Sequence, residues 1–68
     1  MKWKIGDICY FVENNRVIRE ARIVSFHGNF VQLKFGDYAG VRLNIKRIFR
    51  TEEDAKNSIR KKLKSPHL

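Results

Sequence analysis

Residues 21–35 read ARIVSFHGNFVQLKF, and this stretch decides the fold class. Its first six residues alternate between two faces of an extended chain, and its last six alternate again, with Val31, Leu33 and Phe35 on one face. Turn-forming residues at 27–29 separate the two runs. Because a period of two is typical of strands that bury one face, the stretch predicts a β-hairpin.

Short apolar segments flank this hairpin on both sides. Residues 8–12 are rich in branched and aromatic side chains and predict a strand, and the paired asparagines at 14–15 suit a tight turn. In the next strand, 16–26, Val17 and Ile18 are out of step with the alternation, which predicts a bulge or bend. The remaining predicted segments are a glycine-containing turn at 36–40 and short strands at 41–43 and 48–49.

Five short strands joined by tight turns predict a closed sheet, because an open sheet this small exposes both of its edges. We therefore expect a mainly β fold, a small five-stranded barrel over residues 1–50, with one C-terminal helix over 51–65 packed on it. A chain of 68 residues supplies one compact core, so we expect a single domain.

A change of period after Thr51 marks the helix. Thr51 offers an N-cap hydroxyl, and three acidic residues follow it in the first turn, where the helix dipole favours negative charge. A narrow apolar stripe then recurs every four residues, at Ala55, Ile59 and Leu63. We expect the stripe to dock on the barrel, over Phe30 or Phe49; a dimer or partner surface is the alternative interpretation.

The composition points to an anionic partner. Fifteen Lys and Arg against seven Asp and Glu give a formal net charge of +8, which attracts polyanions, nucleic acid foremost among them. The single cysteine, Cys9, allows no internal disulfide, and no apolar run approaches the roughly 20 residues of a membrane span. We expect a cytoplasmic protein without membrane association, as a monomer or weak dimer.

Three segments resemble Tudor domains, a family of SH3-like barrels, in order and spacing. They are residues 3–9 (WKIGDIC), 19–23 (REARI) and 31–38 (VQLKFGDY). The passage RIFRTEE at 47–53 also resembles small bacterial barrel proteins. The resemblance spans about residues 3–49 and implies a Tudor-like, five-stranded SH3-like barrel.

Some Tudor domains hold a methylated lysine or arginine side chain in a cage of aromatic faces through cation–π attraction. Phe35 and Tyr38 match two walls of that cage. The other wall positions hold Glu13 and Arg19, and Gly40 stands where the cage has an asparagine. Because an arginine in the pocket repels a methylated cation, the resemblance implies the fold without this ligand.

A cluster of cations without acids suggests where a polyanion binds. Residues 42–50 contain no Asp or Glu, and Lys34 belongs to the strand expected to pair with this segment. The predicted phosphate contacts are Lys34, Arg42, Lys46, Arg47 and Arg50. Phe30 and Tyr38 are the predicted contacts to bases or sugars, whereas Trp3 is expected to plug the barrel end. The sequence thus predicts a non-catalytic nucleic-acid-binding module.

The alternative function is a protein-interaction module, because SH3-like folds often bind peptides in grooves or at edge strands. Its candidate site is the Phe35–Tyr38 pair beside Glu13, with a peptide or an acidic protein as partner. We predict no enzyme activity, metal site or cofactor, because the candidate groups do not gather at ligand or triad spacing. These groups are Cys9, Ser25, His27 and His67.

Overall fold

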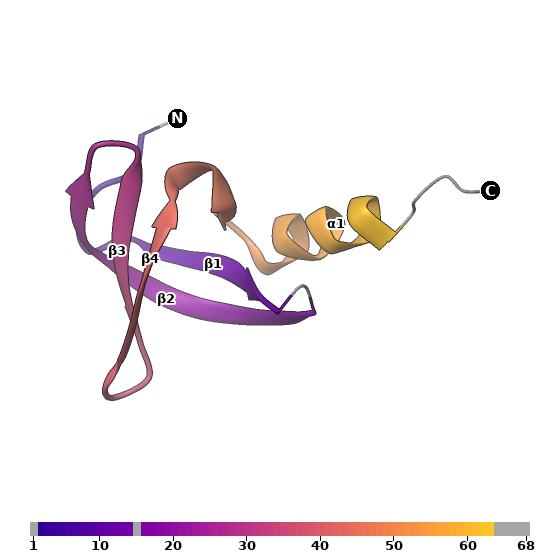
Figure 1. Ribbon diagram of the computed structural model, residues 1–68, viewed down its shortest axis with the longest axis horizontal. Helices are drawn as coiled ribbons and strands as arrows, with labels where there is room; N and C mark the ends of the chain where they lie inside the picture. The colour runs from indigo at the N-terminus through magenta and orange to yellow at the C-terminus, as the bar shows by residue number, and fades with distance from the viewer. Residues whose placement is uncertain (1, 15, 64–68) are drawn as a thin grey trace.

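One antiparallel sheet makes up most of the protein in the computed structural model, which describes residues 2–14 and 16–63. Its five strands are β1 (Ile8–Glu13), β2 (Val17–His27), β3 (Phe30–Phe35), β4 (Ala39–Asn44) and β5 (Ile48–Phe49). A short 3-10 helix, η1 (Ile45–Arg47), precedes β5, and α1 (Glu52–Leu63) follows it (Figure 1). The predicted mainly β fold with a C-terminal helix is confirmed.

The strands lie in the order β4-β3-β2-β1-β5, so consecutive strands pair as hairpins and β5 returns to the far side of β1. In the described part of the chain, β4 and β5 are the two edges of the sheet and do not pair with each other. The turn at Asn14 and the turn at Gly28 both use a positive φ, 56° and 61°, which asparagine and glycine adopt most readily. The predicted tight turns are therefore present at both positions.

The long strand β2 carries the predicted irregularity, but at a different place. Residues 17–22 pair in unbroken register with β1, whereas the β2–β3 register shifts between Ile23 and Ser25. Val24 is the extra residue of this bulge, and such an insertion bends a strand. Val17 and Ile18 depart from the alternation for another reason. They lie at the end of the β1–β2 hairpin, outside the buried cluster, and Val17 is 39% exposed.

The core lies on one face of the sheet. Val31 and Leu33 on β3 are fully buried, as their alternation predicts, and they pair with Leu43 and Val41 on β4. The buried cluster consists of Cys9, Phe11, Ala21, Ile23, Val31, Leu33 and Ile48. Trp3 is half-buried against this cluster, as expected for a residue that covers one end of the core.

The helix begins where the sequence predicts. The backbone N–H of Asp54 donates to the Thr51 hydroxyl at 3.1 Å, the N-cap bond that satisfies one free N–H of the first turn. Ala55 is fully buried and Ile59 half-buried, and α1 contacts β1, β2 and β5 beside the β1–β2 hairpin (Figure 1). The stripe thus packs on the Phe49 side of the sheet; the Leu63 side chain and residues 64–65 lie outside the described part.

Candidate nucleic-acid interface

The face of β2, β3 and β4 opposite the core gathers several of the predicted contacts. Residues paired across neighbouring antiparallel strands project to the same side of a sheet. Lys34 pairs with Arg22 on one flank and Gly40 on the other, and Gln32 pairs with Arg42. We call this surface the outer face and define it by Arg22, Phe30, Gln32, Lys34 and Arg42.

The cations of the outer face lie close together. Arg22 and Lys34 are directly opposite each other, and Arg42 is diagonal to Lys34, a separation of about 7–8 Å in a sheet. All three side chains are exposed, and within the described residues none of them forms an ion pair. The strand segments 22–27, 30–35 and 39–44 contain no Asp or Glu, and Glu20 lies two positions before Arg22 on β2.

The exposed aromatic ring of Phe30 lies at one end of the outer face. Phe30 is 46% exposed and lies opposite His27 on β2 and Asn44 on β4. Ser25 and His27, on the same face of β2, share a hydrogen bond of 2.8 Å between Oγ and Nε2. The structure therefore places Phe30 on the same surface as Lys34 and Arg42, with polar neighbours around the ring.

Lys46 and Arg47 lie near the Phe30 end of the outer face. Both are exposed residues of η1, which directly follows β4. The Asn44 side chain accepts from the backbone N–H of Lys46 at 2.9 Å, and the N–H of Ile45 donates to the Asn29 carbonyl at 2.8 Å. These bonds hold η1 beside the turn that precedes Phe30.

Arg50 has another role. Its guanidinium lies 3.9 Å from the centre of the Trp3 ring, donates to the Lys2 carbonyl at 2.6 Å and approaches Asp7 Oδ2 at 3.8 Å. A guanidinium stacked on an indole and bonded to the backbone fastens the N-terminal segment to the end of β5. The predicted cluster 42–50 is therefore divided between two environments.

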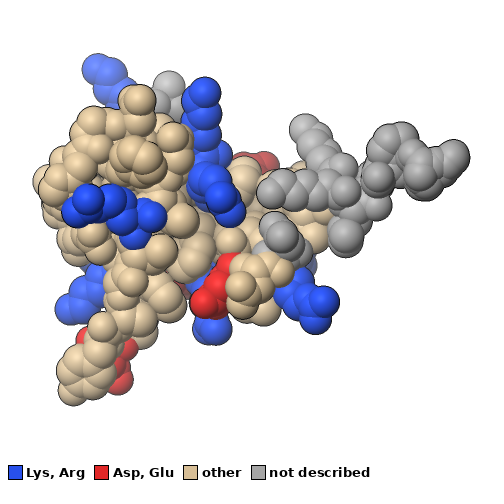
Figure 2. All heavy atoms as spheres, in the orientation of Figure 1, with Lys and Arg blue, Asp and Glu red and all other residues tan. Residues whose placement is uncertain are grey.

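Tyr38 also lies apart from the outer face. It sits in the turn between β3 and β4 and is 98% exposed, beside the exposed Asp37. Figure 2 shows Lys and Arg side chains spread over the sheet, and acidic atoms at the protruding lower end of the molecule. The ring is accessible, but its nearest charged neighbour in sequence is acidic.

The structure separates the positions that the sequence matches to a Tudor cage. Arg19 Nε donates to Glu13 Oε1 at 2.6 Å, and the ring of Phe35 packs edge-on against Phe11 with 5.3 Å between centroids. Phe35 thus contributes mainly to packing, and Tyr38 stands away from it in the turn. Glu13 and Arg19, at the two wall positions without an aromatic residue, form an ion pair with each other.

The chemically reactive groups are dispersed in the described part of the chain. No three His, Cys, Asp or Glu residues gather there as a metal site. Burial, and secondly the charge of Asp7, raises the pKa of the Cys9 thiol to about 11, so Cys9 stays a neutral core residue at pH 7. Ser25 and His27 touch each other, yet the described structure gives them no third partner.

Sequence reasoning missed Arg22. The alternation of residues 21–26 places Arg22 on the face opposite Ala21, and this pattern could have identified Arg22 as a residue of the polar face. Its position opposite Lys34 depends on the register between β2 and β3, which the Val24 bulge sets. A strand pattern alone does not contain that register.

Comparison of the chain with protein-family models, curated proteins and solved structures found no match. Among the described residues, no helix is both long enough and apolar enough to cross a membrane. The functional interpretation therefore rests on the residues of the outer face.

Proposed function

We propose that this protein is a non-catalytic module that binds nucleic acid through the outer face. The observation that carries the proposal is the cross-strand pair Arg22–Lys34, with Arg42 diagonal to Lys34 and no ion pair to any of the three cations among the described residues. Like charges directly opposite each other destabilise a sheet. A polyanion bound across the strands would relieve that repulsion, and its displaced counterions would contribute to affinity.

The neighbouring side chains suit the same ligand. Phe30 offers an exposed ring on which a base stacks, an interaction worth about 1–3 kcal/mol per base. Lys46 and Arg47 on η1 add two exposed cations at that end of the surface. Together with the net charge of +8, these residues favour a nucleic acid over a neutral ligand.

A salt-dependent titration tests the proposal. Fluorescence anisotropy of labelled single- and double-stranded oligonucleotides is measured at several salt concentrations, starting at about 50 mM. If the protein binds about four phosphates, the logarithm of the binding constant should fall with the logarithm of the salt concentration with a slope of about −3 to −4. Absence of binding at the lowest salt would overturn the proposal.

Variants locate the binding surface. Lys34→Gln and Arg42→Gln each remove one cation of the outer face and should reduce the magnitude of the slope by about 0.7–0.9. Arg16→Gln removes the same charge from an exposed position next to the β1–β2 turn and serves as the matched control. Equal losses in all three variants would mean that net charge, rather than this face, attracts the nucleic acid.

A peptide-binding function is the second candidate, and the free edge of β4 favours it. In the described structure β4 pairs only with β3, so its other edge is open to an added strand, next to the exposed Tyr38. This function predicts capture of a peptide or acidic protein that survives moderate salt and is lost in Tyr38→Ala. Nucleic-acid binding through the outer face predicts the opposite dependence on salt.

We also infer that the sheet belongs to the Tudor-like class of SH3-like barrels. The strand order, the bent β2 and the 3-10 turn before β5 support this classification. A neutral, buried thiol at Cys9 suits the reducing cytoplasm, where we propose that the protein acts.

A further inference from the structure

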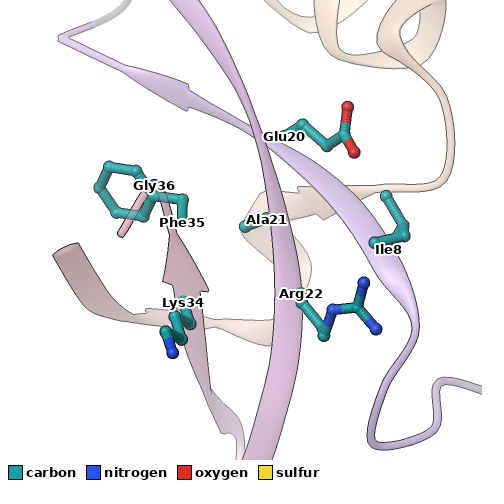
Figure 3. Close-up of a pocket in the computed structure, with 7 residues that line it drawn as sticks. All are labelled: Ile8, Glu20, Ala21, Arg22, Lys34, Phe35 and Gly36. Carbon is teal, nitrogen blue, oxygen red and sulfur yellow. The ribbon is translucent and has the colours of Figure 1, made fainter. Parts of the chain in front are cut away.

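A pocket opens where β2 and β3 separate. Arg22–Lys34 is the last pair that joins these strands, whereas β2 continues to Val17 with β1 as its one strand partner in the described structure. The β1–β2 and β3–β4 hairpins diverge from this point (Figure 1) and leave a hollow of about 350 Å³. Its lining residues are Ile8, Glu20, Ala21, Arg22, Lys34, Phe35 and Gly36 (Figure 3).

The pocket combines an apolar wall with charges of both signs. Ile8, Ala21 and Phe35 supply apolar surface, and Phe35 is held in place by its edge-on contact with Phe11. Arg22 and Lys34 belong to both the pocket and the outer face, so a chain bound across that face reaches the pocket. The volume lies at the lower end of the roughly 300–1,000 Å³ typical of small-molecule sites.

Glu20 is the one acidic residue among those that line the pocket. It lines the pocket together with the cations Arg22 and Lys34, it is exposed, and within the described residues it forms no ion pair. Figure 3 shows Glu20 and Arg22 extending from the same side of β2. A lone carboxylate weakens the attraction of a phosphate, but it accepts a hydrogen bond from an exocyclic amine of a base.

The backbone of β2 adds further polar groups. Because β3 pairs only with residues 22–27, the edge of β2 over 17–21 has no strand partner on the side of the pocket. Backbone N–H and C=O groups at such an edge are free to bond a ligand. A flat ring with donors and acceptors on its rim is the ligand shape that would contact both this edge and the apolar wall.

We infer that this pocket binds one unpaired, amine-bearing base of a single-stranded nucleic acid, with the Glu20 carboxylate accepting from the amine and Arg22 and Lys34 holding the adjoining phosphates. The inference rests on the proposed function and adds a base preference to it. Cytosine and adenine carry the required amine, and thymine and uracil do not. A duplex is disfavoured because its bases are stacked and must be extruded to enter a pocket.

Base preference provides the test. Anisotropy titrations of the full chain compare oligodeoxycytidine with oligothymidine of equal length at one salt concentration. The unsubstituted protein should prefer oligodeoxycytidine by about tenfold, and Glu20→Gln should bring the two affinities close together. Because Glu20→Gln also removes a negative charge, the affinity for oligothymidine should rise slightly.

Glu53→Gln is the matched control. It removes the same charge from an exposed position in the first turn of α1, outside the pocket, and should leave the preference unchanged. In two-dimensional NMR spectra, the amides of Ala21 and Gly36 should shift with oligodeoxycytidine and not with an abasic oligonucleotide of the same length.

The outcomes separate this inference from the proposed function. Equal affinity for both oligonucleotides in the unsubstituted protein, or an unchanged preference in Glu20→Gln, would overturn the base pocket while binding through the outer face stands. Tighter binding to a duplex than to either single strand would also overturn it. If no oligonucleotide binds at low salt, the inference and the proposed function fail together.

Discussion

At the scale of single residues, the ionisation of Cys9 should lower the stability of the protein at alkaline pH. Its side chain is fully buried on β1, and burial, with a smaller contribution from the charge of Asp7, raises its pKa from 9.0 to about 11. Between these values the unfolded chain releases the thiol proton while the folded protein keeps it. The unfolded state then binds fewer protons, so the free energy of unfolding decreases as pH rises.

We therefore expect a loss of stability between pH 9.0 and about 11 that is absent below pH 9.0. The part due to Cys9 should amount to about 2–3 kcal/mol, and urea unfolding curves across this range measure it. Cys9→Ala should lose this part of the pH dependence, while the titration of Tyr and Lys side chains remains in both proteins. An identical alkaline decline in the variant would contradict the assignment.

At the scale of elements, Arg50 connects the end of β5 with the segment that precedes β1. Arg50→Ala removes the stacking on Trp3 and the hydrogen bond to the Lys2 carbonyl, and we expect it to lower the free energy of unfolding by about 1–2 kcal/mol. Arg50→Lys should recover only part of this, because an ammonium lacks the planar donor fork. Thermal unfolding followed by Trp3 fluorescence measures both changes.

Arg47→Ala is the control for Arg50, because Arg47 is an exposed cation of the neighbouring η1. It should leave stability within about 0.5 kcal/mol of the original. If Arg50→Ala were as stable as Arg47→Ala, the contacts with Trp3 and Lys2 would not hold the N-terminal segment in place.

At the scale of the whole molecule, the net charge of +8 opposes folding, and the Arg22–Lys34 pair concentrates that repulsion in the sheet. Arg22→Gln should raise the free energy of unfolding by about 0.2–1 kcal/mol at low salt while weakening oligonucleotide binding. The gain should shrink at high salt, because ions screen exposed charges. Urea unfolding at low and high salt measures it.

Lys56→Gln removes the same charge from α1, four residues after Glu52 and three after Glu53, where a lysine is favourably placed. This control should therefore show no gain in stability at low salt. Stabilisation by both variants would mean that global charge alone opposes folding, with no special contribution from the outer face.

Local pattern was enough to predict the strands, the three turns between β1 and β4 and the start of the helix. Alternation in residues 30–35 placed Val31 and Leu33 in the core, and Thr51 with its acidic neighbours placed the helix N-terminus. These features depend on side chains within a few positions of one another. The candidate cations Lys34 and Arg42 were found for the same reason, since each lies on the polar side of its strand.

The composition of the outer face was decided only in three dimensions. The register that sets Arg22 opposite Lys34 follows from a one-residue bulge at Val24, and the cations of 42–50 separate because Arg50 meets a segment 48 residues away in the chain. The pocket beside Glu20 likewise exists only because β2 and β3 part. The sequence by itself determined which residues form strands and helix, through short-range periodicity and capping; the tertiary structure decided which charges share a surface, because strand register and long-range contacts have no periodic signal.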